Sequence, residues 1–123
     1  METMLKTTAI IEATTGIVLL AAPAWLASIL LGAPLDTAAG LVVARLAGTA
    51  LLALGVACWL GSRDVQSRAA VGIVAAMLLY NLAAVVLLGS AHFCVGMTGI
   101  GLIPAAVLHT ALAVWCIACL RAT

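Results

Sequence analysis

The chain has 123 residues, of which 67% are hydrophobic and 7% are charged, and its net charge is +1. An average soluble domain is about half apolar and about a quarter charged, and a small fold keeps a large surface relative to its volume. These proportions exclude a water-soluble globular domain, and they exclude disorder, which requires few apolar residues. The sequence therefore predicts an integral membrane protein. No basic block is present, so the lipid bilayer and not nucleic acid is the expected partner.

Four long apolar runs divide the chain. Each exceeds the ~20 residues that cross a hydrocarbon layer of ~30 Å, and each should be helical because lipid offers no partner to unpaired backbone groups. Gly48 and Gly55 share one face of the second run, which favours close helix packing in lipid. We predict an all-α bundle of four transmembrane helices that forms a single domain over 1–123, with helices at about 7–31, 38–61, 69–90 and 98–120.

The first run also has features of a cleaved signal peptide. Lys6 precedes an apolar stretch, and Ala22-Pro23-Ala24 mimics a cleavage site of small residues. Glu12 interrupts the apolar stretch, however, and a signal peptide needs an uninterrupted apolar region. We therefore interpret the run as a membrane span.

The basic residues predict how the chain is oriented in the membrane. If the helices alternate in direction, Lys6, the loop with Arg63 and Arg68, and Arg121 all lie on one side, whereas the loops of the other side contain no Lys or Arg. Cytoplasmic loops carry the excess of Lys and Arg. Both termini are therefore expected on the cytoplasmic side of the membrane.

Polar residues inside the apolar runs are the candidate binding residues, because an ionisable group at mid-depth costs ~2.5–3.5 kcal/mol on insertion scales. A rise of ~1.5 Å per residue places Arg45, Asn81 and His109 at similar levels in the outer half of the membrane, with Tyr80 beside them. These four predict a pocket for a small anionic or carbonyl-bearing ligand, such as a quinone or a lipid headgroup, to which Arg would donate forked hydrogen bonds. The alternative is structural: interhelical hydrogen bonds of ~0.6 kcal/mol each, with the arginine extending outward.

Glu12 is a separate candidate, for binding an ion or a proton. Counted from a helix that starts at residue 7, it lies ~7 Å from the cytoplasmic end, apart from the other polar residues. Small multidrug transporters also place a Glu on the first of four helices, although the aromatic surroundings found there are missing here. The alternatives are a carboxyl near the interface that is protonated or bonded to Thr or water, and a carboxylate paired with a basic residue of a partner subunit.

The cysteines raise the question of a metal or redox site. Cys116 and Cys119 form a C-x-x-C sequence, and Cys58 is expected at a similar level; thiolates together with Glu12 could bind a soft metal. However, the motif ends a predicted helix, whereas redox C-x-x-C pairs gain reactivity at a helix N-terminus. The cytoplasmic side is also reducing. We therefore predict no metal site, and Cys58, Cys116 and Cys119 stay weak candidates.

Five short segments stand out along the chain: Leu31-Gly32-Ala33-Pro34-Leu35, Arg45-Leu46-Ala47-Gly48, Leu54-Gly55, Tyr80-Asn81 and Val107-Leu108-His109. Together they resemble a family of uncharacterised bacterial four-helix membrane proteins that are loosely DoxX-like. The resemblance spans most of the chain, and it implies a location in the bacterial inner membrane. Some DoxX-type proteins are small subunits of quinone-linked oxidoreductases, which implies an accessory role. The resemblance marks Arg45, Gly48, Asn81 and His109 as candidate functional positions.

The short loops and the lack of nucleotide-binding, nucleophile or metalloprotease motifs predict a non-enzymatic protein that requires no cofactor. The first hypothesis is an accessory or structural subunit of a larger, energy-transducing membrane complex. Its partners would be other membrane subunits or further copies of the chain. The alternative hypothesis is a protein that binds or transports a quinone, a lipid or a cation through its intramembrane polar residues.

Overall fold

The computed structural model describes residues 1–122, and every regular element in that range is a helix. Four of the five helices are long and apolar enough to cross a membrane, so the all-α fold with four spans is confirmed. The exception is α2, which is too short to span. The elements are α1 (Glu2–Ala21), α2 (Pro23–Leu31), α3 (Ala38–Gly61), α4 (Arg68–Phe93) and α5 (Leu102–Arg121).

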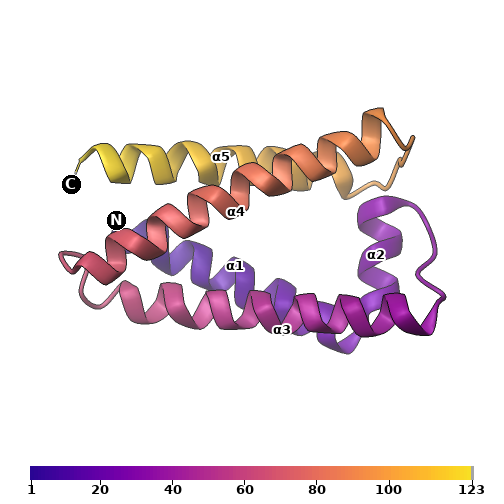
Figure 1. The fold of residues 1–123 in the computed structure, drawn as a ribbon, viewed down its shortest axis with the longest axis horizontal. Helices are drawn as coiled ribbons and strands as arrows, with labels where there is room; N and C mark the ends of the chain where they lie inside the picture. Colours follow the sequence, from indigo (N-terminus) through magenta and orange to yellow (C-terminus); the bar gives the residue numbers. More distant parts are fainter. Residues whose placement is uncertain (123) are drawn as a thin grey trace.

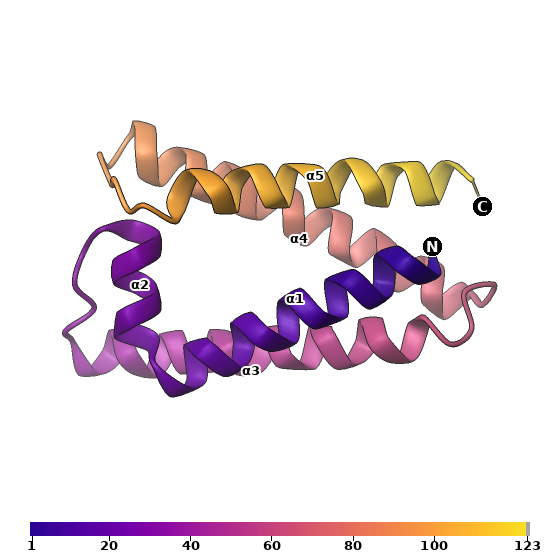
Figure 2. The same ribbon diagram turned by 180° about the vertical axis from the view of Figure 1, so that it is seen from behind.

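The single helix predicted over 7–31 is instead two helices. α1 begins at Glu2, and the chain leaves the helical conformation at Ala22, where φ is −138° and ψ is 60°. Pro23 explains the break, because proline has no N–H to continue the helix and drives the preceding residue toward extended backbone. α2 then turns away from α1 and lies across one end of the bundle (Figures 1 and 2). Of the two helices in this first apolar run, only α1 is therefore long enough to span the membrane.

The other three predicted helices agree closely with the structure. The bounds of α3 are those predicted, α4 extends one residue further at its start and three at its end, and α5 begins four residues later than predicted. Side-chain hydroxyl caps fix the starts of α3 and α4. The Thr37 hydroxyl accepts a hydrogen bond from the backbone N–H of Gly40, and the Ser67 hydroxyl accepts one from Ala70, both at 3.1 Å. Such caps satisfy N–H groups that the helix itself leaves unpaired.

The helices pack as two pairs. α1 lies mainly against α3 and α4 mainly against α5, with fewer contacts between the pairs. In the first pair the backbones touch: a Cβ added to Gly16 would lie 2.6 Å from the carbonyl oxygen of Gly48, and one added to Gly55 would lie 3.0 Å from that of Ala9. Close approach of this kind is what holds helices together in lipid.

The two ends of the bundle are built differently. At the end where both termini and the α3–α4 connection lie (Figure 1), buried apolar side chains from four helices form a continuous core. At the opposite end α2 lies between the helix pairs, tied to the start of α5 by a 2.9 Å hydrogen bond from the Gly101 N–H to the Ile29 carbonyl. The fold is therefore densely packed near the termini and covered by a short transverse helix at the other end. The core includes Met4, Leu5, Cys58, Val74, Met77 and Cys116.

Candidate functional site

A cavity of about 740 Å³ lies between the helices on the side of the bundle that α2 covers, and all five helices contribute to its wall. Its lining extends along α3 from Ala39 to Leu51, which is about 18 Å at a rise of 1.5 Å per residue. Val43 lines the cavity and is nevertheless 65% exposed, so the cavity reaches the outer surface of the bundle, which in a membrane is lipid. Its volume falls within the roughly 300–1,000 Å³ of small-molecule sites.

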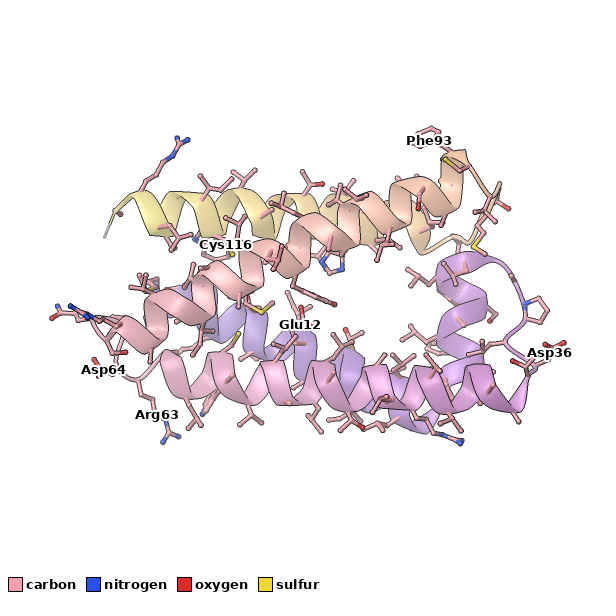
Figure 3. The ribbon with its side chains drawn as sticks, in the orientation of Figure 1. Glu12, Asp36, Arg63, Asp64, Phe93 and Cys116 are labelled. Atoms are coloured by element: carbon pink, nitrogen blue, oxygen red, sulfur yellow. The ribbon has the colours of Figure 1, made fainter. Side chains whose placement is uncertain are left out.

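Polar side chains from three different helices meet in this otherwise apolar cavity. Glu12 and Thr15 come from α1, Tyr80 from α4 and His109 from α5. Figure 3 shows Glu12 directed from α1 into the interior of the bundle. A largely apolar cavity with a few converging polar groups is the usual form of a ligand site.

Glu12 lies farther from the start of its helix than the sequence predicted. Because α1 begins at Glu2 and not at residue 7, Glu12 is about 15 Å from the start of the helix at 1.5 Å per residue. It therefore lies near the middle of α1, where it lines the same cavity as Tyr80 and His109. The sequence had placed it apart from those two residues, and the structure brings the three together.

The Glu12 carboxyl is buried without a full set of partners. The residue is 2% exposed, and its Oε1 atom has no hydrogen-bond partner among the described residues. The hydroxyl of Tyr80 approaches the carboxyl, and within residues 1–122 the one ion pair joins Lys6 to Glu2 near the chain start. A buried polar atom left unpaired costs about 1–3 kcal/mol. One oxygen of Glu12 is thus left without a partner within the described chain.

The imidazole of His109 is oriented by α4. Asn81 is fully buried, and its Nδ2 donates a 2.7 Å hydrogen bond to the carbonyl of Met77. Its Oδ1 is therefore the acceptor that lies 2.7 Å from His109 Nδ1. The hydrogen must be on Nδ1, which leaves the lone pair of the neutral ring on Nε2. The Tyr80 ring also packs edge-on against the imidazole, with the ring centroids 5.6 Å apart.

Arg45 does not join the other three residues of the predicted cluster. It is exposed on α3, while its neighbours Val43, Ala44 and Ala47 form the cavity wall. Its guanidinium makes no hydrogen bond or ion pair within residues 1–122. The structure thus brings Tyr80, Asn81 and His109 together with Glu12, and the arginine on which binding of an anion depended lies outside the cavity.

The three cysteines named as weak metal candidates do not line the cavity. Cys58, Cys116 and Cys119 are buried free thiols in the packed core near the termini, and Figure 3 shows Cys116 directed from α5 into the bundle. Among the described residues, no three His, Cys, Asp or Glu side chains are grouped so that they could hold a metal ion. In this setting a cysteine acts as a small apolar side chain.

A second, smaller cavity of about 300 Å³ lies beyond Tyr80 and His109. Leu30, Tyr80, Ala105 and His109 line both cavities, so these four side chains separate the two. Leu87 lines the smaller cavity and is exposed. The Tyr80–His109 pair is therefore flanked by empty volume on two sides.

No protein-family model, curated protein or solved structure matches this chain in the comparisons made.

Proposed function

We propose that this protein is a non-catalytic integral membrane protein that binds a small amphiphilic molecule from the bilayer. One observation carries the proposal: a cavity of about 740 Å³ has apolar walls and contains Glu12, Tyr80 and His109 from three helices. Apolar walls would bind the tail of such a molecule, and a few fixed polar groups would select its polar end. The cavity reaches the lipid-facing surface at Val43, which supports entry from the bilayer.

The state of Glu12 also supports binding. A polar side chain that serves packing alone is normally satisfied within the protein, as Asn81 is through Met77 and His109. Glu12 instead keeps a buried oxygen without a partner.

Filling the cavity tests the proposal. Ala105 lines both cavities, so Ala105→Phe should exclude a bound molecule. Ala111→Phe on the same helix is the matched control, because Ala111 is exposed and outside both cavity linings. We expect small molecules identified by mass spectrometry to remain with the purified wild type and with Ala111→Phe, and to fall about tenfold or more in Ala105→Phe, a loss of roughly 1.4 kcal/mol.

Equal retention by all three proteins would contradict the cavity proposal. Purification of the wild type without a bound molecule but with fixed larger partners would favour the accessory-subunit hypothesis instead.

We also propose that both termini face the cytoplasm of a bacterial inner membrane. The support is the excess of basic residues on one side, together with the common end of the bundle where the termini and the α3–α4 connection lie (Figure 1). Cys94, in the α4–α5 connection, is the one exposed cysteine of the four. A membrane-impermeant maleimide should therefore label Cys94 in spheroplasts without permeabilisation, and Cys94→Ser should abolish the labelling. Labelling only after permeabilisation would reverse the orientation.

A further inference from the structure

We propose that the ligand is a cationic amphiphile, with its ammonium group at Glu12 and its apolar tail in the cavity toward α2. This inference rests on the proposed function and names the class of ligand. It follows from the hydrogen-bonding character of the polar groups, the balance of charge and the shape of the cavity.

The polar groups of the cavity are mainly acceptors. Glu12 has an unpartnered carboxyl oxygen, and His109 has its lone pair on Nε2 because Nδ1 bonds to Asn81. No Lys or Arg is among the described residues that line the cavity. An ammonium group has three donors and no acceptor, whereas a carboxylate or a quinone carbonyl only accepts. The site therefore matches an ammonium group and disfavours an anion.

The charge of Glu12 also requires a partner. Tyr80 from α4 and Cys58 from α3 both interact with it, and His109 from α5 lines the same cavity. No lysine or arginine of residues 1–122 pairs with Glu12. An ionised carboxylate in hydrocarbon is costly without a countercharge, so either a proton or a cationic ligand must neutralise it. An ammonium ion that binds a protonated Glu12 displaces the carboxyl proton to water, and the charge inside the cavity stays zero.

The cavity has one polar end and one apolar end. Glu12 lies toward the Leu51 end of the α3 wall, because the adjacent Ala13 packs against Gly55. From there the lining continues for about 18 Å along α3, and its far part is formed by three leucines, one isoleucine and one alanine of α2. An elongated ligand thus fits with its charged group near the middle of α1 and its tail beneath α2. The α2 lining residues are Leu26, Ala27, Ile29, Leu30 and Leu31.

Three probes with the same eight-carbon tail test the ligand class. Octylamine, octanol and octanoate are titrated by calorimetry against the full chain in lipid nanodiscs, and Ala105→Phe in the same nanodiscs corrects for partitioning into lipid. For the wild type we expect octylamine to bind at least about tenfold more tightly than octanol, a difference of roughly 1.4 kcal/mol, and octanoate to bind more weakly than either. Glu12→Gln should keep binding octanol, which shows an intact cavity, and should lose the preference for the amine.

Proton release is a second readout. Titrations in two buffers of different ionisation enthalpy should show release of a single proton when octylamine binds to the wild type at a pH where free octylamine is protonated, and no release from Glu12→Gln. If octanol and octylamine bind the wild type equally well, or if Glu12→Gln keeps the amine preference, the ligand class is wrong while the proposed function stands. If no probe binds more to the wild type than to Ala105→Phe, and the two also retain the same molecules on purification, the proposed function itself fails.

Discussion

Gly16→Ala should lower the free energy of unfolding by about 1–3 kcal/mol, the range typical of overpacked cores. The added Cβ would lie 2.6 Å from the Gly48 carbonyl oxygen and 2.8 Å from the Leu52 backbone nitrogen. Both are backbone atoms of α3, so no flexible side chain can move aside, and α1 and α3 must separate. Close packing is the main attraction between helices in lipid, so the separation weakens the pair that forms one wall of the cavity. Reversible unfolding in mixed micelles, followed by circular dichroism, measures the change.

Gly72→Ala is the matched control. Gly72 is also inside a membrane-spanning helix, but a Cβ added there meets nothing within 4 Å. The substitution should be neutral or stabilise the protein by up to about 1 kcal/mol, because alanine favours helix more than glycine does. Equal effects of the two substitutions would mean that α1 and α3 are not in backbone contact in the membrane.

The apolar runs predicted the number of spans because lipid leaves few other structures possible. They did not predict where α1 begins, because an apolar run marks the hydrocarbon layer and not the whole helix. α1 continues outward through polar residues, where Lys6 and Glu2 form a 2.6 Å ion pair one turn apart that supports helix. Those five additional residues place Glu12 near the middle of the helix, while its distance from the edge of the apolar run is unchanged.

The break before α2 could be predicted from the sequence, but the direction in which α2 runs could not. Pro23 is the first residue of α2, a position that proline favours. Gly32 follows the last residue of α2 and caps it with a φ of 70°, a left-handed conformation that suits glycine. Apolar composition alone had joined the two helices. That α2 crosses the bundle depends on tertiary contacts, such as the Gly101–Ile29 hydrogen bond, and these join residues about seventy positions apart in the sequence. The cavity beneath α2 was therefore not predictable.

Counting residues along a helix gives depth but not direction around the helix axis. Arg45 was grouped with Asn81 and His109 from depth alone. In an almost uniformly apolar helix hydrophobicity does not indicate which side faces inward, and the structure turns Ala44 and Ala47 to the cavity while Arg45 is exposed. The Asn81–His109 pair was predictable because both residues are polar in the middle of neighbouring helices, where hydrogen bonding across helices is favoured.

Glu12→Leu should raise the free energy of unfolding by about 1–3 kcal/mol and abolish the preference for octylamine over octanol. The gain follows because the substitution removes a buried carboxyl oxygen that has no hydrogen-bond partner, and such a group carries a desolvation penalty of that size. The loss follows because leucine offers neither a charge nor an acceptor to an ammonium group. The same micelle unfolding experiment and the same probe titrations measure the two effects.

Asn81→Leu is the control that distinguishes a functional from a structural polar residue. Asn81 is as buried as Glu12, but its amide is satisfied, and its removal leaves the Nδ1–H of His109 without its 2.7 Å acceptor. This substitution should therefore destabilise the protein, by about 1–3 kcal/mol. Destabilisation by Glu12→Leu as well would assign the carboxyl a structural role and contradict the ligand site. A stabilising Glu12→Leu together with a destabilising Asn81→Leu would support the ligand site, because proteins keep a destabilising group chiefly where activity requires it.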